Sequence, residues 1–147
     1  MTEQFKNQVF DITIVGGGII GLSCAYKLQL AYPYLNLIVL EKEDVLAKHQ
    51  TGRNSGVIHS GLYYKPGSYR AKNCVNGRVQ LVDFAKEHNI KYDVCGKVVV
   101  AVDQYEVNRL DDILQTGIKN GLKGLEKISA DRLKEIEPNV EGLAALL

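Results

Sequence analysis

The stretch from Asp11 to Leu28 constrains the fold of this chain more than any other part of the sequence. It begins with a short apolar run, Ile12 to Val15, that is typical of a buried strand. Gly16, Gly18 and Gly21 follow with the spacing G-x-G-x-x-G, and a helical pattern begins among them. In such a motif the first glycine permits a tight turn, the second lets backbone N–H groups approach a pyrophosphate, and the third lets the helix pack near the strand. The positive end of the helix would then face the phosphates.

The residues that follow extend this motif into a strand–helix–strand unit. A helix is predicted over residues 20–31, because apolar side chains recur there at helical spacing and Pro33 disfavours helical geometry at the residue before it. A second apolar run over residues 35–40 predicts a strand, which a right-handed crossover would place parallel to the first. The predicted apolar face of the helix consists of Leu22, Ala25, Leu28 and Gln29.

Glu41 comes directly after the second apolar run and 20 residues after Gly21. A carboxylate at the carboxyl end of this strand can accept hydrogen bonds from the hydroxyl groups of an adenosine ribose. A solvated glutamate at a strand end is the plainer interpretation of the same residue. Because the glycine motif and the crossover unit precede it, we interpret this part of the chain as a dinucleotide-binding site.

The polar segment over residues 43–65 indicates which dinucleotide binds. A nicotinamide-binding domain would continue with a second crossover helix and a third apolar strand, whereas this segment carries the run QTGRNSGVIHSG over residues 50–61. Its hydroxyl and backbone N–H groups suit a pyrophosphate and a sugar-like chain. Long loops of this kind are usually functional. An ordinary surface loop is the alternative, and we predict FAD rather than NAD.

The rest of the chain alternates helical and strand-like patterns. Ser68 and Ser129 are predicted helix N-caps, and Pro138 ends the last helix. Cys74 lies on an apolar helical stripe and is predicted to be a small core residue. Arg78, on the same stripe, is expected to need an internal partner. The predicted elements are helices over residues 69–88, 105–120 and 129–137 and strands over residues 90–92 and 97–102.

Composition and charge exclude several classes of protein. The net charge of +1, with scattered Lys and Arg, argues against a nucleic-acid partner. Three widely spaced cysteines argue against a disulfide framework or a zinc site and favour a reducing, cytoplasmic compartment. The longest apolar stretch, residues 12–25, is too short to span a bilayer, which leaves peripheral contact with the inner face of a membrane open. Because only two parallel strands are evident and the chain ends in an apolar run, we expect a truncated, N-terminal part of a larger protein.

Several segments together carry a resemblance to a known family. They are His49 to Ser68 (HQTGRNSGVIHSGLYYKPGS), Arg70 to Cys74 (RAKNC), Tyr92 to Lys97 (YDVCGK) and the pair Glu137-Pro138. The chain resembles the N-terminal part of the D-amino-acid-oxidase-like FAD-dependent oxidoreductases, and within them the branch that acts on L-2-hydroxyglutarate. The glycine motif is common to many flavoproteins, but the loop over residues 50–65 is distinctive.

The resemblance implies an α/β fold, with a Rossmann-like FAD-binding domain of the glutathione-reductase type. This domain would cover residues 1–92, and residues 93–147 would begin an α+β substrate domain. The implied reaction oxidises a 2-hydroxy acid, L-2-hydroxyglutarate, to 2-oxoglutarate by hydride transfer to FAD, with oxygen or a quinone as the final acceptor. Oxidation of glycerol 3-phosphate or of an amine or amino acid by a sister flavoenzyme, and an inactive fragment, are the alternatives.

The resemblance also assigns site residues by position. Gly16, Gly18 and Gly21 would hold the pyrophosphate together with the intervening residues Ile19 and Ile20, Glu41 would hold the ribose, and Lys42 would lie beside the adenine. His59 is the candidate catalytic residue, expected to contact flavin or substrate rather than act as the base, although a histidine with a purely local role in the loop is the alternative. The residues expected along the pyrophosphate, ribityl chain and flavin ring are Thr51, Asn54, Ser55, Gly56, Val57 and His59. No metal ligands are predicted.

Overall fold

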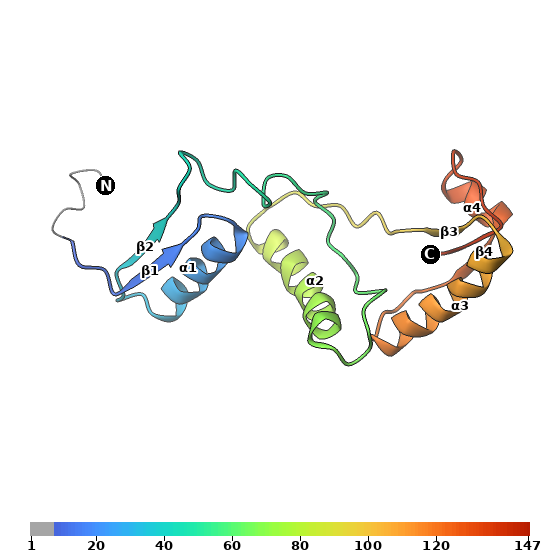
Figure 1. Cartoon of the computed structure of the whole chain (residues 1–147), viewed down its shortest axis with the longest axis horizontal. Coiled ribbons are helices and arrows are strands. Elements are labelled where there is room, and N and C mark those ends of the chain that lie inside the picture. The colour runs from blue at the N-terminus through green and yellow to red at the C-terminus, as the bar shows by residue number, and fades with distance from the viewer. Residues whose placement is uncertain (1–7) are drawn as a thin grey trace. The chain divides into compact units, whose positions relative to one another are not determined.

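The structure of this chain is a computed structural model that describes residues 8–147 (Figure 1). The chain forms two compact units, the first ending at Val57 and the second running from Ile58 to Leu147. The domain boundary that we expect after Tyr92 concerns the assembled protein and stays a prediction.

The first unit is the strand–helix–strand arrangement predicted from the glycine motif. It consists of β1 (Ile12–Val15), α1 (Ile19–Ala31) and β2 (Leu37–Leu40), and α1 lies along the two strands (Figure 1). The strands are parallel, in a register that runs from Ile12 opposite Leu37 to Val15 opposite Leu40. At their starting ends, Asp11 Oδ2 accepts a hydrogen bond of 2.8 Å from the Asn36 N–H, which fixes this register.

The first unit buries little of its apolar surface. Of its described residues only Gly17 is buried, and α1 has no buried residue. Leu22, Ala25 and Leu28 are half-buried as predicted, but Gln29 is exposed and donates a hydrogen bond of 3.1 Å to the Pro33 carbonyl. A parallel sheet normally has both faces covered, and two strands with one helix cannot provide that cover.

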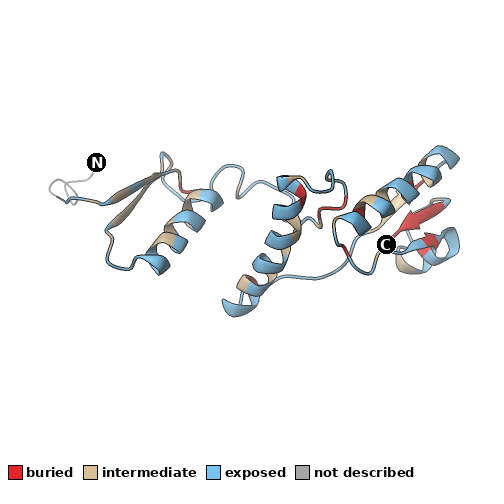
Figure 2. Ribbon diagram, turned by 90° about the horizontal axis from the view of Figure 1, so that it is seen from below, coloured by how far each residue is buried: buried red, intermediate tan, exposed pale blue. Residues whose placement is uncertain are grey.

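The second unit contains three helices and an antiparallel sheet. β5 (Ala144–Leu146) is the central strand of this sheet, between β3 (Val99–Ala101) and β4 (Lys127–Ser129). Val100 of β3 and Ile128 of β4 both lie opposite Ala145. The core lies here, and Figure 2 shows its buried segments in red. Its largest fully buried side chains are Leu110, Leu133 and Leu146. The elements are α2 (Tyr69–Glu87), β3 (Val99–Ala101), α3 (Gln104–Lys119), β4 (Lys127–Ser129), α4 (Ala130–Ile136) and β5 (Ala144–Leu146).

The strand predictions of the second half need correction. The strand predicted over residues 90–92 does not form, and residues 88–98 contain no helix or strand. Ile90 is 50% exposed and Tyr92 39% exposed, so no neighbouring strand or core holds this segment in a ladder. The strand predicted over residues 97–102 is confirmed only for Val99–Ala101. β4 and β5 were not predicted, because three-residue strands carry too little periodicity to be recognised.

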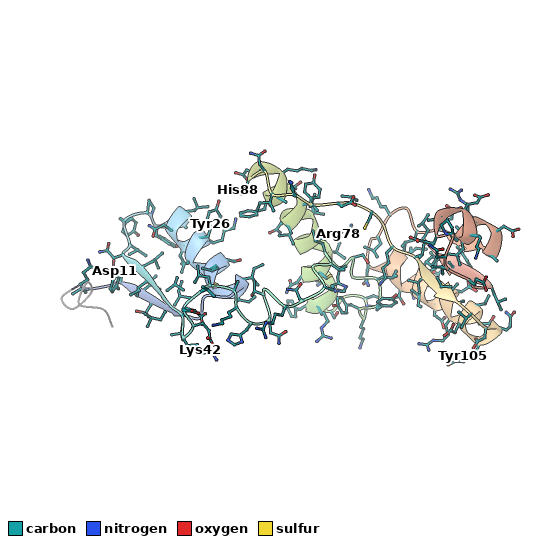
Figure 3. All side chains as sticks on the ribbon, turned by 90° about the horizontal axis from the view of Figure 1, so that it is seen from above. Asp11, Tyr26, Lys42, Arg78, His88 and Tyr105 are labelled. Atoms are coloured by element: carbon teal, nitrogen blue, oxygen red, sulfur yellow. The ribbon has the colours of Figure 1, made fainter. Side chains whose placement is uncertain are left out.

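The helix predictions hold better. Ser68 Oγ accepts a hydrogen bond from the Ala71 N–H, and Ser129 Oγ accepts one from the Arg132 N–H, so both predicted N-caps are confirmed. Cys74 is half-buried rather than fully in the core. Arg78 on α2 (Figure 3) is also half-buried, but makes no hydrogen bond or ion pair with any of residues 8–147. A covered stem with a solvated head group explains how an arginine can occupy this stripe without a partner.

Candidate functional site

The turn between β1 and α1 has the backbone geometry that the glycine motif predicts. Gly16 has a φ of +106°, a conformation that side chains disfavour, and its N–H donates a 2.7 Å hydrogen bond to the Leu40 carbonyl at the end of β2. A Cβ on Gly21 would collide with the Gly16 carbonyl oxygen, so the helix approaches the turn more closely than any other residue would permit. A Cβ on Gly18 would lie 3.2 Å from Thr51 Oγ1.

The start of α1 presents unpaired backbone donors. Among residues 8–147, the N–H groups of Gly18, Ile20 and Gly21 donate no hydrogen bond, while the Ile19 N–H donates to Thr51 Oγ1 at 2.9 Å. The side chains of Ile19 and Ile20 are exposed, so these residues can serve a ligand through their main chain. Free N–H groups at the positive end of a helix form a binding site for a phosphate group.

Glu41 lies immediately after β2, and its side chain connects the end of that strand to the turn that follows β1. Its Oε2 accepts a 2.6 Å hydrogen bond from the Gly17 N–H, and its Oε1 accepts from the N–H groups of Lys42 (2.9 Å) and Glu43 (3.1 Å). These hydrogen bonds, that from Gly17 first, lower the pKa of Glu41 below its ordinary value. A carboxylate offers about four acceptor positions, so an ionised Glu41 retains capacity for a hydroxyl group.

The polar loop is held by its own side chains and by the helix start. Asn54 Nδ2 donates to the carbonyls of Gln50 (2.9 Å) and Thr51 (2.8 Å), and its Oδ1 accepts from the Gly56 N–H (2.7 Å). Thr51 supplies the first turn of α1 with an acceptor from 32 residues away. The loop therefore forms part of the surface beside the glycine turn. Asn54 contributes to this surface by ordering the main chain of the loop.

A shallow cavity of about 180 Å³ lies beside the turn, within the first unit. It brings together two of the predicted glycine-turn and ribose positions, Gly18 and Glu41, with the predicted loop residue Thr51. The full set of lining residues is Gly18, Glu41, Ala47, Lys48, His49, Gln50 and Thr51.

Five further residues at this site were not predicted. Gly17 is buried, donates to Glu41 and accepts from the Ala47 N–H at 3.1 Å. Ala47 has a φ of +60°. Glu43 interacts with His49 Nε2 (2.8 Å) and Lys48 Nζ (3.3 Å), and these contacts, that with His49 first, lower its pKa. Gly17 lies inside the glycine motif, but no motif or spacing in the sequence indicates the positive φ of Ala47 or the contact between Glu43 and His49.

The remaining predicted residues are exposed. Lys42 lies just beyond β2 (Figure 3); its side chain is 75% exposed and its ammonium is 3.8 Å from a Glu43 carboxylate oxygen. Ser55, Gly56 and Val57 are exposed at the end of the first unit. The structure therefore gathers Gly18, Glu41 and Thr51 around the cavity, whereas Lys42, Ser55, Gly56 and Val57 do not line it.

His59 belongs to the second unit, where its side chain is exposed. Its ring makes no hydrogen bond or ion pair within residues 8–147, while its carbonyl oxygen accepts a hydrogen bond from Cys74 Sγ at 3.2 Å. Within the same residues no group of three or more His, Cys, Asp or Glu side chains is arranged to hold a metal ion.

A parallel strand–helix–strand unit with a glycine turn, free helix N–H groups and a carboxylate after the second strand defines a dinucleotide-binding protein. The sequence profile of the FAD-dependent oxidoreductases of the DAO family matches residues 11–147. The chain belongs to this family, which confirms the predicted family and the choice of FAD as cofactor.

Individual relatives agree with this assignment. The chain is 51% identical over 137 residues to the L-2-hydroxyglutarate dehydrogenase of Indibacter alkaliphilus, covering 93% of this chain and 34% of that protein. It is also 51% identical to the mitochondrial L-2-hydroxyglutarate dehydrogenase of Homo sapiens, covering 93% of this chain and 30% of that protein. The chain thus spans about a third of the length of these relatives.

Solved structures confirm the predicted α/β FAD-binding fold. The FAD-bound L-alpha-glycerophosphate oxidase of Mycoplasma pneumoniae superposes with a TM-score of 0.79 at 28% identity, covering 95% of this chain and 37% of that one. The L-proline dehydrogenase of P. horikoshii superposes with a TM-score of 0.75 at 23% identity, covering 95% and 36%, which shows a shared fold.

Proposed function

We propose that the protein containing this chain oxidises L-2-hydroxyglutarate to 2-oxoglutarate, with FAD as the hydride acceptor. The observation that carries FAD binding is the set of free N–H groups at the start of α1, next to a carboxylate whose pKa is lowered. The substrate is inferred from the relatives, which are about 51% identical and named L-2-hydroxyglutarate dehydrogenases.

The residues of the first unit would bind the cofactor in a defined way. Gly18, Ile20 and Gly21 would donate their N–H groups to the pyrophosphate, and Glu41 would accept a ribose hydroxyl. Bound FAD supplies the hydride acceptor that the oxidation of an alcohol requires. The other residues proposed to contact the cofactor are Gly16, Ile19, Lys42, Thr51, Asn54, Ser55, Gly56 and Val57.

His59 is proposed to contact flavin or substrate. Its exposed ring, without a partner among residues 8–147, is available for such a contact. An imidazole carries two ring nitrogens and can therefore donate or accept a hydrogen bond at a substrate hydroxyl or carboxylate. The base that removes the hydroxyl proton is expected elsewhere in the protein.

A substrate panel tests the proposed reaction. The full-length protein is assayed with L-2-hydroxyglutarate, glycerol 3-phosphate and sarcosine, with an artificial dye as acceptor. We expect the highest kcat/KM with L-2-hydroxyglutarate. The superposition on a glycerophosphate oxidase makes glycerol 3-phosphate the specific competitor, and a higher kcat/KM with that substrate would overturn the proposal.

The family resemblance supports a proposal for the natural electron acceptor, and the widely spaced cysteines support one for the cellular location. No helix within residues 8–147 is long and apolar enough to cross a membrane. We propose a cytoplasmic protein that passes electrons to oxygen or to a quinone at the inner face of the membrane. Comparing reoxidation of the reduced protein by oxygen and by a soluble quinone, and its partition between membrane and soluble fractions, distinguishes the two acceptors.

A further inference from the structure

The segment from His59 to Tyr64 is held to the rest of the second unit by three hydrogen bonds, which come from side chains further along the chain. Cys74 Sγ on α2 donates to the His59 carbonyl at 3.2 Å. Asn120, at the end of α3, donates through Nδ2 to the carbonyls of Gly61 (3.0 Å) and Tyr64 (2.8 Å). Together they fix three peptide planes in six consecutive residues.

Packing holds the middle of the same segment. Leu62 is 5% exposed and belongs to the hydrophobic core around Leu110 and Leu146. Gly61 has a φ of +91°, and a Cβ there would lie 3.2 Å from Val75 Cγ2 on α2. The segment therefore lies close against α2, in a backbone conformation at Gly61 that favours glycine.

Asn120 is committed to this segment rather than to its own helix. Its main-chain N–H already bonds to the carbonyl of Thr116, so its amide group is not required to end α3. Both groups that accept from its Nδ2 are carbonyl oxygens. Flipping the amide would therefore place Oδ1 against these two oxygens, where no donor is present. Its Oδ1 is buried without a partner among residues 8–147, a loss that the two loop contacts must offset.

The consequence concerns His59. Because its ring has no hydrogen-bond partner among residues 8–147, the hydrogen-bonded main chain is what fixes the point from which the imidazole extends. We propose that Asn120 and Cys74 are positioning residues, which fix the main chain so that His59 meets flavin or substrate. This inference rests on the role proposed above for His59.

The test uses the full-length protein and matched variants. Asn120→Asp removes the amide donors and faces two carbonyl oxygens with a carboxylate, and Asn120→Ala is the milder second variant. Asn108→Ala changes an exposed asparagine on the same helix and is the control. Cys74→Ala removes the thiol donor, whereas Cys74→Ser keeps a donor and should restore function. Each variant is measured for FAD content, melting temperature, kcat, KM, and hydrogen exchange in peptides covering residues 59–68.

We expect Asn120→Asp and Asn120→Ala to raise hydrogen exchange across residues 59–68 and to lower kcat by about 10- to 100-fold, as misplacement of a reacting group by about 1 Å does. FAD content and KM should change little. In a His59→Ala background the same Asn120 changes should cause no further loss of kcat, because Asn120 is proposed to act only through the placement of the His59 ring. Asn108→Ala and Cys74→Ser should match the unaltered protein.

Unchanged hydrogen exchange in both Asn120 variants would overturn the inference, as would an equal fall of kcat with and without His59. Should the unaltered protein fail to oxidise L-2-hydroxyglutarate, the proposed function is wrong. The role of Asn120 can then still be decided. Hydrogen exchange is measured as before, and the Asn120 variants are compared with and without His59 on whichever substrate of the panel is oxidised.

Discussion

At the scale of single residues, Glu41 connects the fold of the first unit with its proposed ligand site. Its carboxylate bonds to the Gly17 N–H across 24 residues and thereby ties the glycine turn to the end of β2. The same bond lowers its pKa and keeps it ionised as an acceptor for a hydroxyl group. A contact that stabilises the turn thus also keeps Glu41 in the form required for the ribose contact that we propose.

The lowered pKa of Glu41 predicts an acid dependence of stability. A carboxylate whose pKa is lower in the folded state stabilises the fold above its unfolded pKa of about 4.3, and the contribution is lost as the pH falls through the folded value. Replacing Glu41 with Gln should therefore lower the melting temperature near pH 7 and flatten its fall between about pH 5 and pH 3. Melting curves of both proteins across this range are the measurement, and parallel pH profiles would contradict it.

Thr51 predicts an effect on the helix start. Thr51→Val keeps the shape of the side chain but removes the oxygen that accepts from the Ile19 N–H. Loss of a helix cap costs about 1 kcal/mol, and we expect a loss of stability of that size on chemical unfolding. Thr116→Val is the comparison, since that hydroxyl only donates to a carbonyl within α3. An equal effect of the two changes would argue against a capping role for Thr51.

At the scale of elements, the close approach of α1 to the turn depends on Gly21. The missing side chain lets the helix begin against the Gly16 carbonyl, and the free N–H groups of the first turn lie where we propose that the pyrophosphate binds. Element prediction worked where the pattern was long or a cap was present, as in α2 and α3. It failed over residues 90–92, where an apolar run has no strand beside it.

Replacing two helical glycines with alanine should harm the protein at one position, by loss of FAD retention, and stabilise it at the other. Gly21→Ala places a methyl group on the Gly16 carbonyl oxygen and should abolish FAD retention in the full-length protein. Gly77→Ala in α2 meets no atom within 4 Å, and should stabilise the protein by up to about 1 kcal/mol through helix propensity. Flavin absorbance per protein and urea unfolding measure the two effects. Normal flavin content in Gly21→Ala would show that the turn tolerates displacement of α1.

At the scale of the whole molecule, the chain contains two units that differ in completeness. The second unit encloses a core in which Leu133 and Leu146 are each 1% exposed. The first unit leaves Val15 85% exposed and Ile20 78% exposed, because two strands and one helix cannot cover both faces of a sheet. The chain also spans about a third of its relatives.

This difference predicts how the 147-residue chain behaves alone. Its glycine turn and Glu41 would provide part of the proposed FAD site, but the flavin end would lack most of its surroundings. We expect the isolated chain to release FAD during gel filtration and to show no turnover of L-2-hydroxyglutarate, whereas the full-length protein retains the cofactor. Tightly held flavin in stoichiometric amount in the isolated chain would refute this expectation.

The sequence alone determined the strand–helix–strand unit, the glycine turn, the position of Glu41 and the caps at Ser68 and Ser129. These features depend on periodicity, sterics and hydrogen bonds within a few residues, which the order of residues records directly. Only the tertiary structure paired Glu41 with Gly17, placed Thr51 against the start of α1, brought Asn120 to Gly61 and made residues 144–146 a central strand. Those contacts join residues 24, 32 and 59 positions apart or pair strands of three residues, so they depend on how the whole chain packs.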